Sequence, residues 1–351
     1  MTENLLIIRV TSYRLRVTSN EHMKPQQFKT KWADTELKVE FGRFAHQAHG
    51  SCTVQYGDTM VLATATRSEN IRGGIDYFPL MVDYEEKLYA AGKIKGSRFI
   101  KREGRPTDEA VLSGRLIDRS IRPLFDSDVR NDVQVVITIL SYDGEHDPEV
   151  PGLLAASLAL TTSDIPWAGP IAGVRVGREE GKLVINPTET QLDSSDLDLL
   201  VVGTPERILM IEARADEVDE KIMQEAVELG QKNLKPIMKL IDDIHKKVGV
   251  EKVDVKKQNM LHKSPEDIEA DKEMERIIDM AQEFVQQNVE KILFDAPKAT
   301  KLERRRAYAQ IADEMDAHLE ANGVEDWDVR SKAKKQIKYL VEAEVTRQIL
   351  T

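Results

Sequence analysis

The sequence predicts an α+β domain followed by a small all-α domain, and three observations lead to that fold class. Of the 19 glycines, 17 lie at or before Gly230, so turn chemistry is confined to the first two thirds of the chain. Up to about residue 245, β-rich runs alternate with helical ones, and beyond it only helical patterns follow. The length of 351 residues allows about two domains of ~150 residues each.

The strands of the first domain are predicted from runs of β-branched and aromatic residues. Residues 53–56 and 60–66 are predicted to form a β-hairpin around Gly57-Asp58, since that pair supplies the positive φ of a tight turn. Further strands are predicted over 133–140, 173–176, 183–185, 198–202 and 208–212. Helices between such strands are typical of an α+β core with mixed or antiparallel pairing.

Two helices and a linker complete the predicted first domain. The helix over 151–161 is rich in small residues, which suits close packing on a sheet. The helix over 218–248 has apolar residues near helical spacing, and Pro236 is predicted to kink or split it. Residues 249–263 carry Lys and Asp with few large apolar side chains, so a linker is expected there.

Three helices are predicted for residues 264–351. The first begins well, with Ser264 as N-cap and Pro265 at the first helical position. The predicted buried stripes are Ile277, Ala281, Phe284, Val285, Val289 and Ile292; Tyr308, Ile311, Ala312, Met315 and Leu319; and Val329, Ala333, Ile337, Leu340, Val341 and Val345. Residues 1–22 show no clear pattern, so the predicted divisions are an extension over 1–22, a core over 23–248, the linker and the helical domain.

Composition limits the classes of function. With 50 basic against 61 acidic residues the formal net charge is −11, which argues against a polyanion-binding surface spread over the whole protein. Either the partner is not nucleic acid, or the basic residues gather locally. The single Cys52 excludes an internal disulfide and a multi-cysteine zinc site, and no apolar run approaches the ~18 residues of a membrane span. We therefore expect a cytoplasmic protein with no membrane partner.

The basic residues do gather locally. Residues 93–130 hold ten basic and six acidic side chains, and Thr107 and Pro123 mark the ends of a helix within that segment. Arg115, Arg119 and Arg122 share one face of this helix, at a spacing where like charges cost stability. Phosphate oxygens suit the planar donors of arginine. The alternative is that these arginines pair with acids, Arg122 with Asp118 one turn earlier and the others elsewhere in the fold or across a subunit interface.

The loop over 96–106 places one aromatic residue, Phe99, among basic residues. Single-stranded nucleic acid needs that combination, because a base stacks on the ring while cations follow the backbone. A lone phenylalanine in a loop can equally plug the core.

Other polar clusters are weaker candidates. Asp143 and Asp147 flank a strand end and have carboxylates that suit a metal, although paired acids in a glycine-containing loop are usually solvated. Ser194-Ser195 and the hydroxyls over 161–163 are most simply explained as a turn and a helix end.

Two motifs show a resemblance to a known family. The stretches FIKREGRPT (99–107) and RLIDRSIRPLF (115–125) closely resemble the signature of the bacterial polynucleotide phosphorylase (polyribonucleotide nucleotidyltransferase) family. Residues 57–62, 76–80, 163–166 and 186–188 are also similar to that family. The resemblance runs from about Phe28 to the C-terminus. It implies a first RNase PH-like core domain plus the helical domain, without the second core and the small RNA-binding modules of the full-length family.

The resemblance implies a reaction and assigns its catalytic residues to a different core domain. The family degrades RNA from the 3′ end by reversible phosphorolysis, in which inorganic phosphate releases nucleoside diphosphates and Mg²⁺ assists. The phosphate-binding serines and metal-binding aspartates belong to the second core. Neither catalytic nor metal-binding residues are therefore expected in this chain. A single-domain RNase PH fits less well, because it has no trailing helical domain.

The role that the resemblance implies for this chain is guidance of single-stranded RNA. Phe99, Lys101, Arg102 and Arg105 match the loop that lines the channel entrance of a ring-shaped homotrimer, and Arg115, Arg119 and Arg122 match the family's arginine helix. The departures from the family pattern are Ile100, Lys101, Ser120 and Arg214. Two hypotheses follow: part of a phosphorolytic exoribonuclease, with RNA-degradation complexes as further partners, or a non-catalytic RNA-binding and assembly module.

Overall fold

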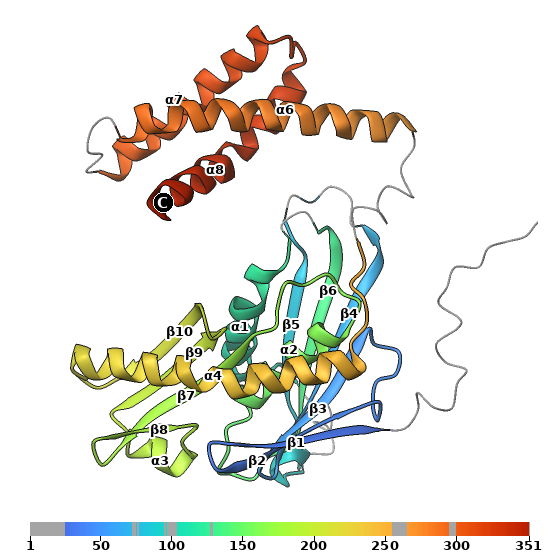
Figure 1. Ribbon diagram of the computed structural model, residues 1–351. Coiled ribbons are helices and arrows are strands. Elements are labelled where there is room, and N and C mark those ends of the chain that lie inside the picture. The colour runs from blue at the N-terminus through green and yellow to red at the C-terminus, as the bar shows by residue number, and fades with distance from the viewer. Residues whose placement is uncertain are drawn as a thin grey trace, which may run out of the picture. The chain divides into compact units, whose positions relative to one another are not determined.

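The computed structural model describes residues 25–71, 75, 77–94, 96, 104–126, 129–254, 265–294 and 300–350. The chain divides into two compact units, Met1–Val255 and Lys256–Thr351 (Figure 1). The first unit is α+β and the second is all-α, as the glycine distribution predicts.

The larger sheet of the first unit has six strands. They are β1 Gln26–Trp32, β2 Thr35–Phe41, β3 Gly50–Tyr56, β4 Thr59–Ile71, β5 Leu80–Glu86 and β6 Asn131–Ser141, in the order β1-β2-β3-β4-β6-β5. Neighbouring strands are antiparallel, except that β5 and β6 are parallel. The predicted hairpin is confirmed as β3 and β4, with Gly57 at a φ of 60°. Helix α1 (Asp108–Ile121) connects β5 to β6 and packs on β5, as a parallel pair requires.

Strands β1, β2 and β5 are absent from the sequence prediction. The turn between β1 and β2 consists of Ala33 and Asp34, with φ angles of 44° and 67°. An alanine in the left-handed region is uncommon, so the turn lacks the glycine or asparagine by which a hairpin is recognised. Turn signals in the sequence therefore do not predict this hairpin.

The smaller sheet has four antiparallel strands. They are β7 Ala172–Glu179, β8 Lys182–Ile185, β9 Leu197–Gly203 and β10 Ile208–Ala215, in the order β10-β9-β7-β8. All four match predicted strands. Glu180 and Gly181 form the turn between β7 and β8, with φ angles of 47° and 79°. The short elements of this unit are η2 Leu88–Ala91, η3 Arg122–Leu124 and α3 Glu189–Asp193.

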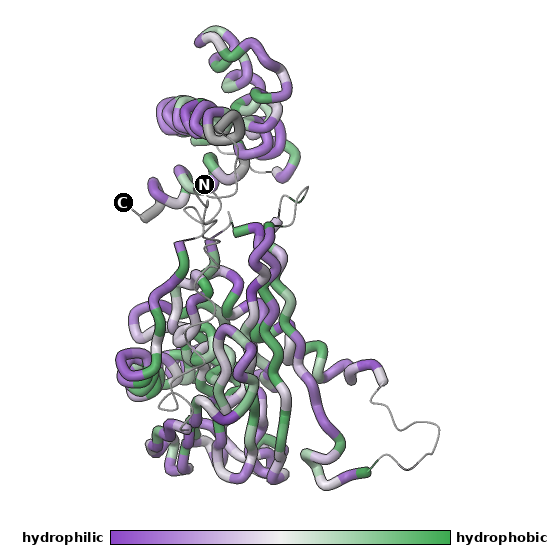
Figure 2. Tube along the Cα trace, turned by 90° about the vertical axis from the view of Figure 1, so that its right-hand side faces the viewer, coloured by the Kyte–Doolittle hydropathy of each residue, from purple (hydrophilic) through white to green (hydrophobic). Residues whose placement is uncertain are grey.

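Helix α2 (Glu149–Thr162) lies at the centre of the first unit. It contacts β3, β4 and β6 of one sheet and β7 of the other, and all its residues are buried. A helix that is hydrophobic all round must be enclosed in this way. Close approach depends on Gly50 of β3, where an added Cβ would lie 2.0 Å from the Ala159 carbonyl oxygen. Figure 2 shows hydrophobic and hydrophilic residues interspersed along the trace of the first unit.

Helix α4 (Glu220–Val248) is continuous, so of the kink or split predicted at Pro236 the split is wrong. Proline removes one backbone hydrogen bond and crowds the preceding turn. Pro236 lies on the exposed face, where water can reach the freed carbonyl group. The opposite face buries Leu234, Ile237 and Ile241 in the same core on both sides of the proline. Packing against the smaller sheet therefore keeps the helix whole.

The first residues of the predicted linker are attached to the core. The backbone N–H groups of Val250 and Val253 donate to the carbonyls of Thr162 and Asp164. Lys252 Nζ donates to the carbonyls of Leu160 at 2.6 Å and Ser163 at 2.8 Å, and so caps the C-terminal end of α2. Burial lowers the pKa of Lys252 to about 8, despite the opposing charge of Asp164. Residues 255–263 of the predicted linker lie outside the described residues.

The second unit contains the three predicted helices. They are α6 Pro265–Val289, extended by a π-helical turn η4 (Glu290–Phe294), α7 Lys301–Ala321 and α8 Trp327–Leu350. Ile277, Ala281, Met315 and Ala333 are buried together as predicted. Ser264, the predicted cap of α6, lies outside the described residues. Buried Arg330 joins α7 to α8, because it donates to Asp316 at 3.0 Å and to the Val324 carbonyl at 2.8 Å.

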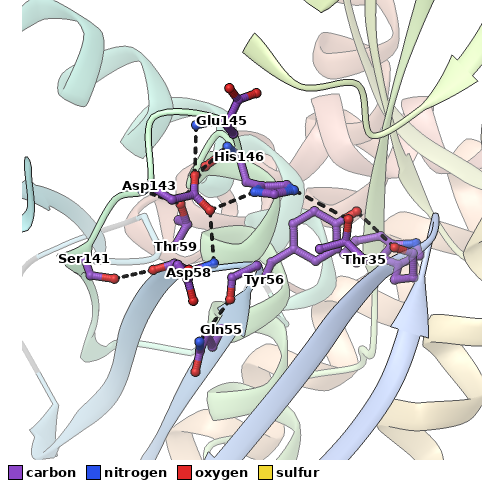
Figure 3. Close-up of polar contacts among 11 residues, drawn as sticks. Thr35, Gln55, Tyr56, Asp58, Thr59, Ser141, Asp143, Glu145 and His146 are labelled. Atoms are coloured by element: carbon purple, nitrogen blue, oxygen red, sulfur yellow. Dashed lines mark hydrogen bonds and ion pairs between the residues drawn. The ribbon is translucent and has the colours of Figure 1, made fainter. Parts of the chain in front are cut away.

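One carboxylate organises the junction between β6 and α2. Asp143 accepts hydrogen bonds from the backbone N–H groups of Asp58, Glu145 and His146, and its Oδ2 lies 2.8 Å from His146 Nδ1 (Figure 3). Burial acts to raise the pKa of Asp143, but these hydrogen bonds outweigh it and hold the pKa well below its usual range. The bonds fasten the tip of the β3–β4 hairpin to the loop that leads into α2.

We expect Gly50→Ala to lower the free energy of unfolding by about 3 kcal/mol, because the new methyl group would overlap the α2 backbone. Chemical denaturation monitored by circular dichroism measures this. Gly104→Ala is the matched control, since an added Cβ there meets nothing within 4 Å, and it should change stability by less than ~0.5 kcal/mol. Equal effects of the two substitutions would contradict the close contact.

Asp143→Asn should destabilise the first unit at pH 7 by roughly 1–3 kcal/mol, because an amide cannot accept all of the hydrogen bonds. The folded-state pKa is lowered, so the stabilising effect of the carboxylate is complete above the unfolded value of about 4 and is lost as pH falls towards the folded pKa. The difference from the unaltered protein should therefore shrink below pH 4. Urea titrations from pH 7 to 3 test this, with exposed Asp58→Asn as control. A difference that is independent of pH would contradict the charge argument.

Candidate nucleic-acid interface

The predicted RNA-binding residues lie between the end of β5 and the first residue of η3. Phe99, Lys101 and Arg102 fall outside the described residues, so the structure does not show their contacts. Arg105, Arg115, Arg119 and Arg122 are described. The segment that contains all of them follows the carboxyl end of β5, one of the two parallel strands, and in open α/β sheets that edge is where ligands commonly bind.

Helix α1 has the orientation that its sequence predicts. The Thr107 side chain accepts a hydrogen bond from the N–H of Ala110 and donates to Glu86 at 2.9 Å, so the cap also ties the helix to β5. Ala110, Ile117 and Ile121 are buried. Arg115 and Arg119 are exposed. Ser120 is one of the departures from the family pattern. It is buried, and its hydroxyl donates a hydrogen bond to the Leu116 carbonyl at 2.8 Å.

Two adjoining grooves run between α1 and β5. A groove of about 390 Å³ is lined by Arg105 with Glu86 and Lys87. A second, of about 450 Å³, is lined by Arg115 and Arg119 with Asp83 and Asp118. Both share Tyr84, Pro106 and Ala110. Three of the predicted arginines therefore border one continuous side of α1.

The arginines differ in how strongly the protein itself engages them. Arg105 and Arg115 form no ion pair within the described part of the chain. Arg119 Nη1 lies 3.1 Å from Glu212 Oε2, but the two side chains are 58% and 52% exposed, and such surface pairs contribute little. A polyanion can therefore compete for Arg105, Arg115 and Arg119.

Arg122 is occupied, and here the alternative interpretation of the sequence agrees with the geometry. Its Nε donates to Asp118 at 2.6 Å. Its other nitrogens donate to the carbonyls of Phe78 at 3.3 Å and Leu80 at 3.2 Å. Arg122 thus holds the beginning of β5 against the end of α1, and its remaining capacity for phosphate is small.

Sequence reasoning misses the residues that complete the grooves. Tyr84 and Glu86 come from β5, which is not among the predicted strands. The alternation of Leu80, Val82 and Tyr84 along β5 is the signal that could have revealed them. Burial raises the pKa of Tyr84 well above its usual value, so the tyrosine stays neutral.

The weaker candidates are engaged within the fold. Asp143 is saturated by its hairpin contacts. Asp147 and Glu149 both pair with Arg175, whose side chain is 13% exposed, at the N-terminus of α2, so carboxylates already occupy the end that would attract an anion. Thr162 and Ser163 donate to carbonyls of α2, and Ser195 accepts from the Arg178 N–H, as a helix end and a turn.

The rest of the described residues add no metal site. They contain no group of three or more histidine, cysteine, aspartate or glutamate side chains placed to hold an ion. Across the same described ranges, no helix is both long and apolar enough to cross a membrane.

Comparison with family models identifies both parts of the first unit. Residues 35–166 match domain 1 of the 3′ exoribonuclease family, and residues 169–233 match domain 2. Domain 1 covers most of the six-stranded sheet with α1 and α2, and domain 2 covers the smaller sheet and half of α4. The RNase PH-like α+β core expected from the motifs is confirmed.

Curated relatives are similar over a longer stretch. The chain is 52% identical over 228 residues to the polyribonucleotide nucleotidyltransferase of Anoxybacillus flavithermus, covering 65% of this chain and 32% of that protein. It is 44% identical over 323 residues to the Bacillus velezensis enzyme of the same name, covering 92% of this chain and 43% of that protein. The chain thus spans about a third to two fifths of the length of these relatives.

Among solved structures, a chain of the Archaeoglobus fulgidus exosome with RNA bound to the active site has a TM-score of 0.45 and 17% identity. The match covers 62% of this chain and 87% of that chain. The two family domains lie in consecutive order along one compact unit, and the curated relatives extend the similarity beyond it. The chain belongs to the 3′ exoribonuclease family, and its relatives within that family are polyribonucleotide nucleotidyltransferases.

Proposed function

We propose that this chain guides single-stranded RNA as part of a 3′-to-5′ phosphorolytic exoribonuclease. The whole enzyme uses inorganic phosphate to release nucleoside diphosphates, and the reaction is reversible. The observation that carries the proposal is the row of exposed arginines along α1, with Arg105 and Arg115 unpaired among the described residues. Family membership and the names of the relatives support the reaction class.

The binding chemistry follows from the residue types. Arg105, Arg115 and Arg119 offer planar donors that match phosphate oxygens. Lys101 and Arg102 add charge in the preceding loop, and Phe99 offers a ring on which a base can stack. Arg122 lies on the same side of the helix, but it acts mainly by holding β5 against α1. Its contribution to RNA affinity is therefore expected to be the smallest of the arginines.

Catalysis is assigned to another core domain. The N-terminus of α2, where backbone N–H groups would bind phosphate, faces Asp147 and Glu149 instead. We therefore propose that the Mg²⁺ and phosphate sites lie in a second core. The ring-shaped homotrimer, partners in RNA-degradation complexes and a cytoplasmic location belong to the same proposal.

A second candidate function is a non-catalytic RNA-binding and assembly module. The same blocked N-terminus of α2 favours it, because the described residues offer no phosphate site of their own. Both candidates place RNA on α1. They differ in whether a second core completes a catalytic site.

Replacing Arg105 and Arg115 together by alanine should weaken binding of a fluorescein-labelled oligo(A) by roughly tenfold near 0.1 M salt. It should also reduce the slope of log affinity against log salt by about 1.4, since each phosphate contact on a single strand contributes about 0.7. Fluorescence anisotropy measures both quantities. Arg207→Ala with Lys239→Ala removes the same charge from exposed positions elsewhere and should have little effect.

Lys101→Ala with Arg102→Ala provides the corresponding test of the loop. If neither double substitution on this side changed affinity or salt dependence, RNA guidance by α1 and its loop would be refuted.

Incubation of the isolated chain with poly(A), phosphate and Mg²⁺ should release no nucleoside diphosphate, because carboxylates occupy the N-terminal end of α2. Thin-layer chromatography of radiolabelled RNA detects such release. A full-length relative serves as the positive control. Phosphate-dependent release by this chain alone would show that catalysis does not require a second core.

A further inference from the structure

The second unit carries a basic surface that the arginine motif does not include. Lys301, Arg304, Arg305 and Arg306 occupy the first two turns of α7, and Lys291 lies in η4. All five are exposed, and none forms an ion pair with a described residue. We call these five residues with Phe294 the α7 basic surface. It is concentrated in a chain whose net charge is −11.

The order of charges along α7 is unfavourable for the helix itself. Basic side chains at a helix N-terminus oppose the macrodipole, which favours acids there and bases at the C-terminal end. In α7 the acids Asp313, Glu314, Asp316 and Glu320 follow in the second half instead. The one acid of the first turn, Glu303, accepts the Thr300 N–H in a capping box. A local rule broken without an evident structural gain is typical of a functional site.

An exposed aromatic residue lies at the same end of the unit. Ile292 and Leu293 of η4 pack in one cluster with Tyr308 of α7, and η4 contacts α7. Phe294 is the next residue of η4 and is 51% exposed. Its ring is therefore accessible to solvent in the element that contacts α7. Leu302 adds a second exposed apolar side chain there.

We propose that the α7 basic surface is a second contact for single-stranded RNA. The cations follow the phosphate backbone, and the Phe294 ring stacks on a base, which is the combination that binds single strands without sequence preference. The proposal rests on the proposed function for the identity of the polyanion. Charge complementarity and the exposed ring favour RNA over an acidic protein, which would not need the ring.

The test measures binding of fluorescein-labelled oligo(A) to the full chain at several salt concentrations. Replacing Arg304, Arg305 and Arg306 by alanine should weaken binding on the order of tenfold and reduce the salt slope by about 2. Phe294→Ala should weaken binding roughly fivefold or more with the salt slope unchanged. The matched control replaces exposed Lys272, Lys332 and Lys335 by alanine and should leave binding within about twofold.

Two further measurements separate binding from folding. Alanine suits a helix and removes the unfavourable charges, so the melting temperature of the triple variant should be unchanged or higher. The corresponding triple arginine-to-lysine variant keeps the charge and should restore most of the affinity. Unchanged affinity in the alanine variant, or a loss equal to that of the control, would overturn the inference.

The same assay separates this surface from the α1 site. If the Arg105 and Arg115 double substitution weakens binding and the α7 triple does not, the proposed function stands and the α7 inference fails. If the α7 triple alone weakens binding, the α7 inference stands and the α1 site fails.

Discussion

Complete burial of α2 is the constraint on which the first unit depends. A helix enclosed on all sides needs apolar and small residues throughout, and it needs neighbours that approach closely, as Gly50 does at Ala159. Its two ends must also be satisfied without water. Asp147 and Glu149 with Arg175 close the N-terminal end, and Lys252 caps the carbonyls of the C-terminal end. The hairpin tip held by Asp143 fixes the entry to the same helix.

Because both ends of α2 are satisfied within the fold, we look for binding residues on the surface instead. The helix end that could have bound phosphate is filled by the chain's own carboxylates, so the central helix acts as structure. Helix α1 differs, because one face packs on β5 while the other leaves arginines beside two grooves. The arginines of this segment also differ from one another. Arg122 donates hydrogen bonds that hold β5, whereas Arg115 has no partner among the described residues. Local concentration of charge, rather than net charge, decides what such a surface attracts.

In the second unit, too, positive charge is concentrated locally on the surface, and there it opposes a helix dipole. Its core is small and apolar, and Arg330 supplies a buried polar connection between α7 and α8. The basic residues at the beginning of α7 contribute nothing to that core. Their position opposes the helix dipole, which distinguishes them from the many exposed charges on the other helices. An acidic protein can therefore present two separate basic surfaces, one on each unit.

The sequence by itself determined the class of both units, the β3–β4 hairpin, the smaller sheet and the ends of α1, because glycine turns, caps and periodicity are local properties. It also placed Arg115 and Arg119 on the face of α1 opposite Ala110, Ile117 and Ile121. Only the tertiary structure decided that α4 runs through Pro236, since packing on both sides of the proline outweighs a local preference. Likewise, the hydrogen bonds of Arg122 to the carbonyls of Phe78 and Leu80 and the closure of α2 by Arg175 depend on partners distant in sequence. Those partners come together only when the strands are in register, and no local sequence pattern predicts this.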